Sequence, residues 1–230
     1  MCTVSVVPAG SGFRLACNRD ERRTRPRALA PRIHSCGARR ALWPCDPQSG
    51  GTWIGVNDRG LAIVLLNRTV RRAAGSPFPT LSRGALIPRL LGEPRVDAAV
   101  ERALSQLHPR NALGRFEAFT LVMVQCDRIA IVEHRPNMTA ITLHRLQHAL
   151  LFTSSSLGDE IVDPPRRRLF AGLMHSTRDH LEAQARFHRH RWRDRPHLSV
   201  RMSREDAATV SHTVVDVSKE AIAVRYVPTI

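Results

Sequence analysis

Residues 1–21, MCTVSVVPAGSGFRLACNRDE, contain two short apolar runs separated by residues that bend the backbone. Residues 4–7 are typical of a strand, residues 8–12 of a turn and residues 13–17 of a returning strand, which together predict a β-hairpin. The polar run Asn18-Arg19-Asp20-Glu21 follows, and a closed hairpin would bring it back beside Cys2. The stretch therefore predicts either a hairpin with a polar end or a reactive site built around a thiol.

The length of 230 residues suits one domain with a substantial core, and we predict a single domain over residues 1–230. Hydrophobic residues make up 43% of the chain and charged residues 24%, which is typical of a globular protein. No apolar run reaches the roughly 18 residues of a membrane span, and the first residues lack the features of a signal peptide. The sequence therefore predicts a cytoplasmic protein without a membrane span.

The formal net charge is +15, from 35 basic and 20 acidic residues. Such a charge raises the question of nucleic-acid binding. Lys219 is the only lysine, however, so the charge comes almost entirely from scattered arginines, as expected of codon bias in a GC-rich genome. No nucleic-acid-binding motif accompanies them, so nucleic acid is not expected as a partner, whereas an anionic small ligand remains open.

The five cysteines are Cys2, Cys17, Cys36, Cys45 and Cys126, an odd number without a CxxC pair. This spacing predicts neither a disulfide framework nor a structural zinc site, and we predict no metal site. Cys17 and Cys126 lie in apolar runs and are expected to be inert core residues. Cys2 differs from them because of its position near the start of the chain.

Strand-like and helix-like segments alternate in blocks along the rest of the chain. Residues 22–49 are rich in Arg and Pro and predict an extended surface loop, while residues 52–56 and 61–66 predict two strands joined by the turn Asn57–Gly60. Short turns between strands indicate antiparallel sheets, and two helical blocks can cover their outer faces. The predicted class is α+β, a four-layer αββα sandwich. Two further helical segments are predicted over residues 80–107, kinked or split at Pro88, and over residues 165–190. Strand pairs are predicted over residues 118–134, 139–154 and 209–227.

Cys2 has the chemistry of an N-terminal nucleophile. A methionine followed by a small residue is commonly removed, which would leave Cys2 with a free α-amino group of pKa about 7.7–8.0, suited to a general base at neutral pH. Its thiol is a strong nucleophile. Asp20 could orient the amine if the hairpin brings it back, and Asn67, at the end of an apolar strand, could stabilise an oxyanion.

The motifs MCT (1–3), NRDE (18–21) and GGTWIGVNDRGLAIVLLN (50–67) resemble those of the NRDE proteins, also called the transport and Golgi organisation family. That family in turn resembles the N-terminal nucleophile hydrolases of the choloylglycine hydrolase and penicillin V acylase group. The resemblance implies an αββα sandwich and cleavage of a small non-peptide amide without a cofactor. It implies Cys2 as the nucleophile, Asp20 as the residue that orients the amine and Asn67 as an oxyanion-hole residue.

Other positions depart from the pattern of those hydrolases. Their arginine precedes the aspartate by a few residues, whereas Arg19 is adjacent to it here. Their second asparagine corresponds to the serines 154–156, and the position of a late arginine holds Val210, with Arg204 nearby. We predict substrate-binding roles for Arg19, Asn18, Trp53 and Ser155; Asn18 could instead brace the turn, and Trp53 could be a core residue.

A second hypothesis is a carrier without catalysis that holds haem or an acylated ligand in the same pocket. The family resemblance includes links to haem or lipid handling. The segment HRHRWRDRPH (188–197) carries His188, His190 and His197 among arginines, and histidine can ligate haem iron while arginine pairs with propionates. His188 and His190 are two residues apart and would not share a helix face, so the alternative for this segment is a solvated basic loop.

Overall fold

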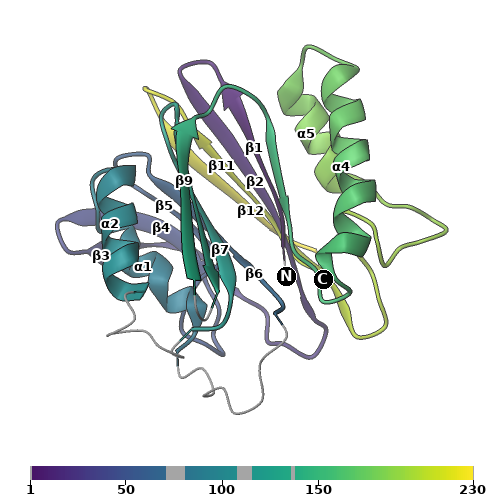
Figure 1. Cartoon of the computed structure of the whole chain (residues 1–230), viewed down its shortest axis with the longest axis horizontal. Coiled ribbons are helices and arrows are strands. Elements are labelled where there is room, and N and C mark those ends of the chain that lie inside the picture. Colours follow the sequence, from purple (N-terminus) through teal and green to yellow (C-terminus); the bar gives the residue numbers. More distant parts are fainter. Residues whose placement is uncertain (1, 71–80, 108–115, 136–137, 230) are drawn as a thin grey trace. The chain divides into compact units, whose positions relative to one another are not determined.

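The computed structural model describes residues 2–70, 81–107, 116–135 and 138–229 (Figure 1). The chain divides into two compact units, one formed by Met1–Arg25 with Leu146–Ile230 and the other by Pro26–Arg145. We refer to them as unit 1 and unit 2. Unit 1 is therefore discontinuous in the sequence, and the prediction of one domain over residues 1–230 stays a prediction.

Unit 1 is built on a five-stranded antiparallel sheet in the order β10-β1-β2-β11-β12. The central strands β1 and β2 come from the start of the chain, and their neighbours come from its last third (Figure 1). The bounds are β1 Cys2–Ala9, β2 Gly12–Arg22, β10 Leu150–Thr153, β11 Ala207–Val217 and β12 Ile222–Pro228.

The predicted N-terminal hairpin is confirmed, and its turn is tight. Gly10 has a φ of 54°, a left-handed conformation that glycine adopts without steric cost. The polar run 18–21 does not follow the second strand but lies within β2, where Asn18, Arg19 and Asp20 are buried. Cys2 lies directly opposite Arg19. The strand extends through these polar residues because β11 pairs with them on the other side.

Replacing Gly12 with alanine is expected to lower the free energy of unfolding by about 1–3 kcal/mol, because a Cβ there would lie 1.9 Å from the backbone oxygen of Val217 on β11. The matched control is Gly172→Ala in a helix, where nothing lies within 4 Å of the added Cβ. That substitution is expected to raise stability by up to about 1 kcal/mol. Urea unfolding of both variants checks the pair; equal effects would contradict the close approach at Gly12.

Helices α4 (Asp159–His175) and α5 (His180–Arg189) lie beside each other and pack on the sheet of unit 1 (Figure 1). The side chain of Asp179 accepts a hydrogen bond from the Glu182 backbone N–H and caps α5. The rings of Phe170 and Phe187 meet edge to face at 5.0 Å and join the two helices. Both rings belong to a buried cluster with Leu151 of β10 and Val200.

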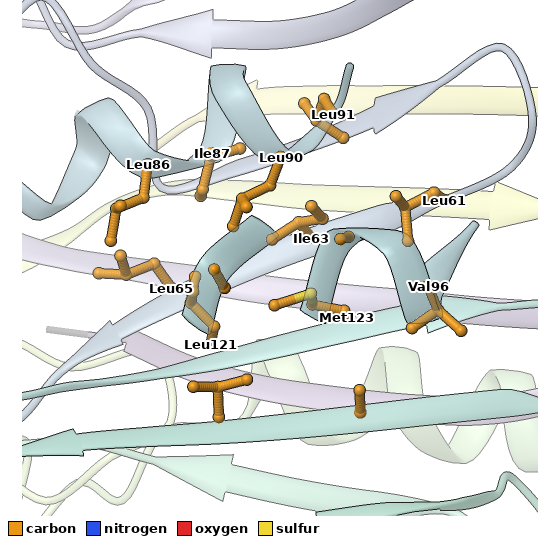
Figure 2. Close-up of a cluster of buried hydrophobic side chains, with 14 of the residues drawn as sticks. Leu61, Ile63, Leu65, Leu86, Ile87, Leu90, Leu91, Val96, Leu121 and Met123 are labelled. Carbon is orange, nitrogen blue, oxygen red and sulfur yellow. The ribbon is translucent and has the colours of Figure 1, made fainter. Parts of the chain in front are cut away.

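Unit 2 is an antiparallel sheet of seven strands in sequence order, β3 to β9, with helices α1 and α2 packed against it. Alternate residues Leu61, Ile63 and Leu65 point toward the helices, as a strand of period two requires (Figure 2). The bounds are β3 Leu29–Cys36, β4 Arg39–Cys45, β5 Ile54–Asn57, β6 Ala62–Asn67, α1 Leu86–Leu90, α2 Val96–Leu107, β7 Phe119–Gln125, β8 Arg128–Arg135 and β9 Met138–Arg145, with a 3₁₀ turn at Arg83–Ala85.

Several sequence predictions need correction. Cys126 is not a core residue but is exposed in the turn between β7 and β8, and the helix predicted over residues 165–190 is two helices, α4 and α5. Residues 22–49 are not a loop: they include β3 and β4, and β3 is an exposed edge strand, where proline is tolerated and alternation is weak. Residues 139–154 are not a hairpin, because β9 and β10 belong to different sheets. The helix predicted over residues 80–107 is split, as expected, but the break lies between α1 and α2 and not at Pro88, which lies in the first turn of α1, where a missing N–H costs nothing. The predicted α+β class is confirmed.

Candidate functional site

Cys2 is the first residue of β1 and lies between β10 and β2. Its backbone nitrogen donates to Ser154 Oγ at 3.1 Å, and its carbonyl accepts from the Ser154 backbone N–H at 2.9 Å. The residue is only 4% exposed. The pKa of the Cys2 thiol is lowered, above all by a hydrogen bond with the Cys17 side chain, although burial opposes this. The backbone of Cys2 is therefore held in place, and its thiol is more acidic than an ordinary cysteine thiol.

Asp20 is buried in β2 one residue after the partner of Cys2. Thr209 lies opposite it, where β11 has a bulge, and the Thr209 hydroxyl donates to Asp20 Oδ1 at 2.6 Å. Burial raises the pKa of Asp20, while the positive charge of Arg166 and the Thr209 hydroxyl act against the rise. The structure thus places a fixed carboxyl group in the strand next to Cys2.

Arg166 projects from α4 and is fully buried. Its guanidinium donates to Thr3 Oγ1 at 2.6 Å, to the Ser199 carbonyl at 2.6 Å and to the Leu198 carbonyl at 3.0 Å. Thr3 follows Cys2 directly, so Arg166 ties the start of β1 to the helix. Sequence reasoning missed this residue, and its only signal was an arginine on the inward face of an amphipathic helix.

Ser155, a predicted site residue, does not contact Cys2 through any hydrogen bond given for the described residues; its neighbour Ser154 does. The Ser155 hydroxyl accepts from Arg204 Nη2 at 3.0 Å, and its N–H donates to Asp159 Oδ1 at 2.9 Å. The half-buried Arg204 also lies close enough to Asp20 for their charges to interact. Arg204, which lies near the sequence position of the late arginine of the hydrolases, thus contacts Ser155 in unit 1.

Arg19 is buried, and its guanidinium lies 3.6 Å from the Glu21 carboxylate. The carboxamide of Asn18 has a different environment: Nδ2 donates to the His188 and Val200 carbonyls, both at 2.9 Å, and Oδ1 accepts from His188 Nδ1 and His212 Nδ1. These four bonds use the donors and acceptor of the amide. Asn18 lies within β2 and so braces no turn; its carboxamide instead joins β2 to His188 and Val200, and substrate binding by Asn18 stays a prediction.

We expect the free energy of unfolding to fall in acid because of the two histidines that bond to Asn18, His188 and His212. Burial lowers the pKa of His188 well below its usual range and that of His212 to about 4, so both rings are neutral at pH 7. A histidine in the unfolded chain binds a proton near pH 6.5, so the unfolded state gains protons first as the pH falls below that value. The contribution of each ring to stability is therefore present above pH 6.5 and is lost below it.

For His212 the expected loss between pH 6.5 and 4 is up to about 3 kcal/mol. Urea unfolding at several pH values should show a shallower decline for His212→Gln than for the unchanged protein, with the exposed His144→Gln as control. Asp20, whose pKa is raised, acts in the opposite direction but is common to all three proteins. Parallel curves for His212→Gln and the unchanged protein would contradict the assignment.

The segment 188–197 combines a buried start with an exposed continuation. His188 lies in α5, and its ring is held on both sides, by Asn18 at Nδ1 and by Ser5 Oγ at 2.8 Å from Nε2. A ring bonded in this way does not fit a ligand to haem iron. Of the residues that follow, Arg191 and residues 193–197 are exposed, as expected of a solvated basic loop, whereas His190 and Trp192 are half-buried.

Asn67 and Trp53 belong to unit 2. Asn67 is the last residue of β6, opposite Phe119, and is half-buried. Trp53 is buried just before β5, and its carbonyl accepts from the Leu65 N–H at 2.8 Å. The predicted oxyanion-hole role of Asn67 and the binding role of Trp53 stay predictions.

The sequence model of the family described as "Transport and Golgi organisation 2" matches residues 1–161, more than half of the chain. The chain belongs to this family. The match covers the whole of unit 2 and, in unit 1, β1, β2, β10 and the start of α4. A comparison with curated protein sequences returns no match.

Solved structures similar to this family member include an acylase, an acid amidase and a hydrolase. Penicillin V acylase from Agrobacterium tumefaciens is 15% identical, with a TM-score of 0.55 over 100% of this chain and 86% of its own. The N-acylethanolamine-hydrolyzing acid amidase ortholog of Caenorhabditis elegans is 13% identical, with a TM-score of 0.63 over 93% and 92%. The C2A mutant of conjugated bile acid hydrolase from Clostridium perfringens is 10% identical, with a TM-score of 0.53 over 100% and 92%. The similarity confirms the predicted N-terminal nucleophile hydrolase-like fold.

Within the described part of the chain, every helix is too short or too polar to cross a bilayer. Among the same residues, His, Cys, Asp and Glu side chains form no group of three or more that could hold a metal ion.

Proposed function

We propose that this family member is an N-terminal nucleophile amidohydrolase that cleaves a small non-peptide amide with Cys2. The observation that carries the proposal is the position of the Cys2 backbone nitrogen, 3.1 Å from Ser154 Oγ, in a strand whose partner carries Asp20. Removal of Met1 would turn this nitrogen into an amine without moving it from its hydrogen-bond partner. One residue would then supply both the nucleophile and the general base.

The reaction proceeds in two halves. The Cys2 amine takes the thiol proton, and the sulfur attacks the amide carbon to form a tetrahedral oxyanion. The resulting ammonium returns the proton to the leaving nitrogen as the C–N bond breaks, which leaves a thioester on Cys2. Water, deprotonated by the same amine, then attacks the thioester carbon and releases the acid and the free thiol.

The other residues have supporting roles in this proposal. Ser154 and Asp20 orient the amine, and the positive charge of Arg166 helps Asp20 to remain ionised despite its burial. Arg19 and Ser155, which belong to the same unit as Cys2, contribute to substrate binding, while the oxyanion role of Asn67 and the binding role of Trp53 stay predictions. No cofactor is needed for these steps. We place the activity in the cytoplasm, and five free thiols are compatible with a reducing compartment.

The substrate class follows from the names of the similar structures. The names of those proteins mention penicillin V, a conjugated bile acid and an N-acylethanolamine, and all three compounds contain a non-peptide amide. These three compounds form the first test panel. Each pairs an acyl group with a small amine, so a single mechanism through an acylated Cys2 serves for all of them.

The test combines the intact mass of the purified protein with the panel assay. The expected mass lacks Met1, and rapid acid quenching during turnover should trap an acyl group on the Cys2 peptide. Retention of Met1 in protein that cleaves a panel amide would overturn the amine-base mechanism. Loss of Met1 without cleavage or acylation by any panel compound would overturn the amidohydrolase proposal. Saturable binding of haem or an acyl ligand in that protein would then support a carrier.

A further inference from the structure

Two thiols lie together in the sheet of unit 1. Cys17 in β2 is directly opposite Val4 in β1, and Cys2 is two residues before Val4. Since successive side chains of a strand alternate between the two faces, Cys2, Val4 and Cys17 project from the same face. Cys2 and Cys17 therefore occupy diagonal positions on neighbouring strands, close enough for their side chains to interact.

Their diagonal placement brings the two side chains within reach of a hydrogen bond, and this contact lowers the pKa of Cys2 and raises that of Cys17. Both residues are buried, Cys2 at 4% and Cys17 at 0% exposure, so water does not compete strongly for this bond. The residues that flank Cys17 on the adjacent strands are Val4 and Thr213, neither of which carries a charge. Cys17 thus lacks a cationic neighbour in register, whereas Cys2 has Arg19 directly opposite.

This asymmetry sets the direction of the hydrogen bond. The contact with the Cys2 side chain, and after it burial, raise the pKa of Cys17 well above its usual value, while the same contact lowers the pKa of Cys2. Because Arg19 lies opposite Cys2 and only uncharged residues lie opposite Cys17, Cys2 is the thiol that ionises first, so Cys17 keeps its proton and donates to Cys2. A thiolate in a buried site gains more from such a donor than an exposed thiolate does, because the local dielectric is low.

We propose that Cys17 is a positioning residue for the nucleophile: its S–H donates to Cys2 Sγ, fixes the direction of that sulfur and stabilises its thiolate. This inference rests on the proposed function in assigning Cys2 as the nucleophile, but the pairing of the two thiols is independent of any substrate. The proposal gives Cys17 a role, whereas its apolar surroundings in the sequence predict only an inert core residue.

The experiment follows thiolate absorbance near 240 nm during a pH titration, a signal that does not require a reagent to reach a buried thiol. Cys17→Ala removes the donor, and Cys17→Ser keeps an O–H donor at the same position. Cys2→Ser supplies the baseline for the other thiols, and Cys126→Ser, at an exposed turn, is the matched control. Urea unfolding of each variant verifies that it is folded.

Loss of the donor is expected to move the Cys2 titration upward by about one pH unit in Cys17→Ala. Cys17→Ser should retain most of the original midpoint, and Cys126→Ser should retain all of it. With a panel amide that is cleaved, Cys17→Ala should lower kcat at neutral pH while KM changes little, since Cys17 is fully buried and does not contact the substrate.

An unchanged Cys2 midpoint in folded Cys17→Ala would overturn the proposal. The same holds if Cys17→Ser and Cys17→Ala behave alike, because the effect would then come from packing and not from the donor. A shifted midpoint without cleavage of any panel amide would leave the thiol pair established while the amidohydrolase proposal fails. Cleavage of a panel amide with an unshifted Cys2 midpoint would support the amidohydrolase proposal while the proposed role of Cys17 fails.

Discussion

Cys2→Ser is expected to reduce amide cleavage by about a thousandfold or more, because it replaces the proposed nucleophile while keeping a small residue after Met1. A hydroxyl at this position is a much poorer nucleophile near pH 7 than a thiol whose pKa is lowered. The measurement is kcat/KM for whichever panel amide the unchanged protein cleaves, together with the mass of the N-terminal peptide after acid quenching.

The thiol control for this experiment is Cys126→Ser, since Cys126 is exposed and lies in the turn between β7 and β8 of unit 2. Its activity is expected to stay within about twofold of the unchanged protein, as is usual for surface positions. Cleavage that persists in Cys2→Ser at an undiminished rate would mean that the reaction does not pass through a thioester on Cys2. Equal losses in both variants would point to thiol oxidation during preparation.

Arg166→Ala is expected to give the largest loss of stability, about 3–5 kcal/mol, because it removes a buried charge that is paired and hydrogen-bonded. The Leu198 and Ser199 carbonyls and the Thr3 hydroxyl would lose their donor, and a cavity would open between α4 and the sheet. Urea unfolding measures the change. Binding or activity assays on the same variant would report on the loss of charge near Asp20.

The neighbouring residue provides a matched control. Arg167 is more than half exposed and pairs with Asp163 one helical turn away, so Arg167→Ala is expected to cost no more than about 0.5 kcal/mol. Arg166→Met tests whether the stability loss in Arg166→Ala comes from the missing charge or from the cavity, because methionine fills the space without carrying a charge. A stability loss in Arg166→Ala no larger than in Arg167→Ala would contradict the bracing role.

The N-terminal hairpin was predictable from the sequence because its turn lies between two apolar runs and the side chains alternate locally. The position of Cys2 beside Arg19 follows from that pairing alone. Ser154 was not distinguishable from Ser155, because which serine bonds to Cys2 depends on the register between β1 and β10, strands separated by most of the chain. Arg166 was hidden for a similar reason, since its partners lie in a distant strand and loop.

The errors in the fold also concern pairing over long distances. Residues 139–154 have the composition of two strands, and nothing in their periodicity indicates that β9 ends unit 2 while β10 joins the sheet of β1. The strand β3 was missed because it is an edge strand with little buried surface, so its sequence is not constrained to alternate. Local pattern identifies a strand well only where one of its faces is buried.

The discontinuity of unit 1 has a consequence for synthesis on the ribosome. Residues 26–145 emerge directly after the N-terminal hairpin and contain every strand of the seven-stranded sheet, so that sheet can assemble early. The hairpin must wait for β10 and β11, and the bond between Asp20 and Thr209 joins residues 189 positions apart. Until then β2 presents a free edge, which is where nascent sheets aggregate. Cys2 is thus made well before β10 and β11, and its surroundings are complete only after those two strands have left the ribosome.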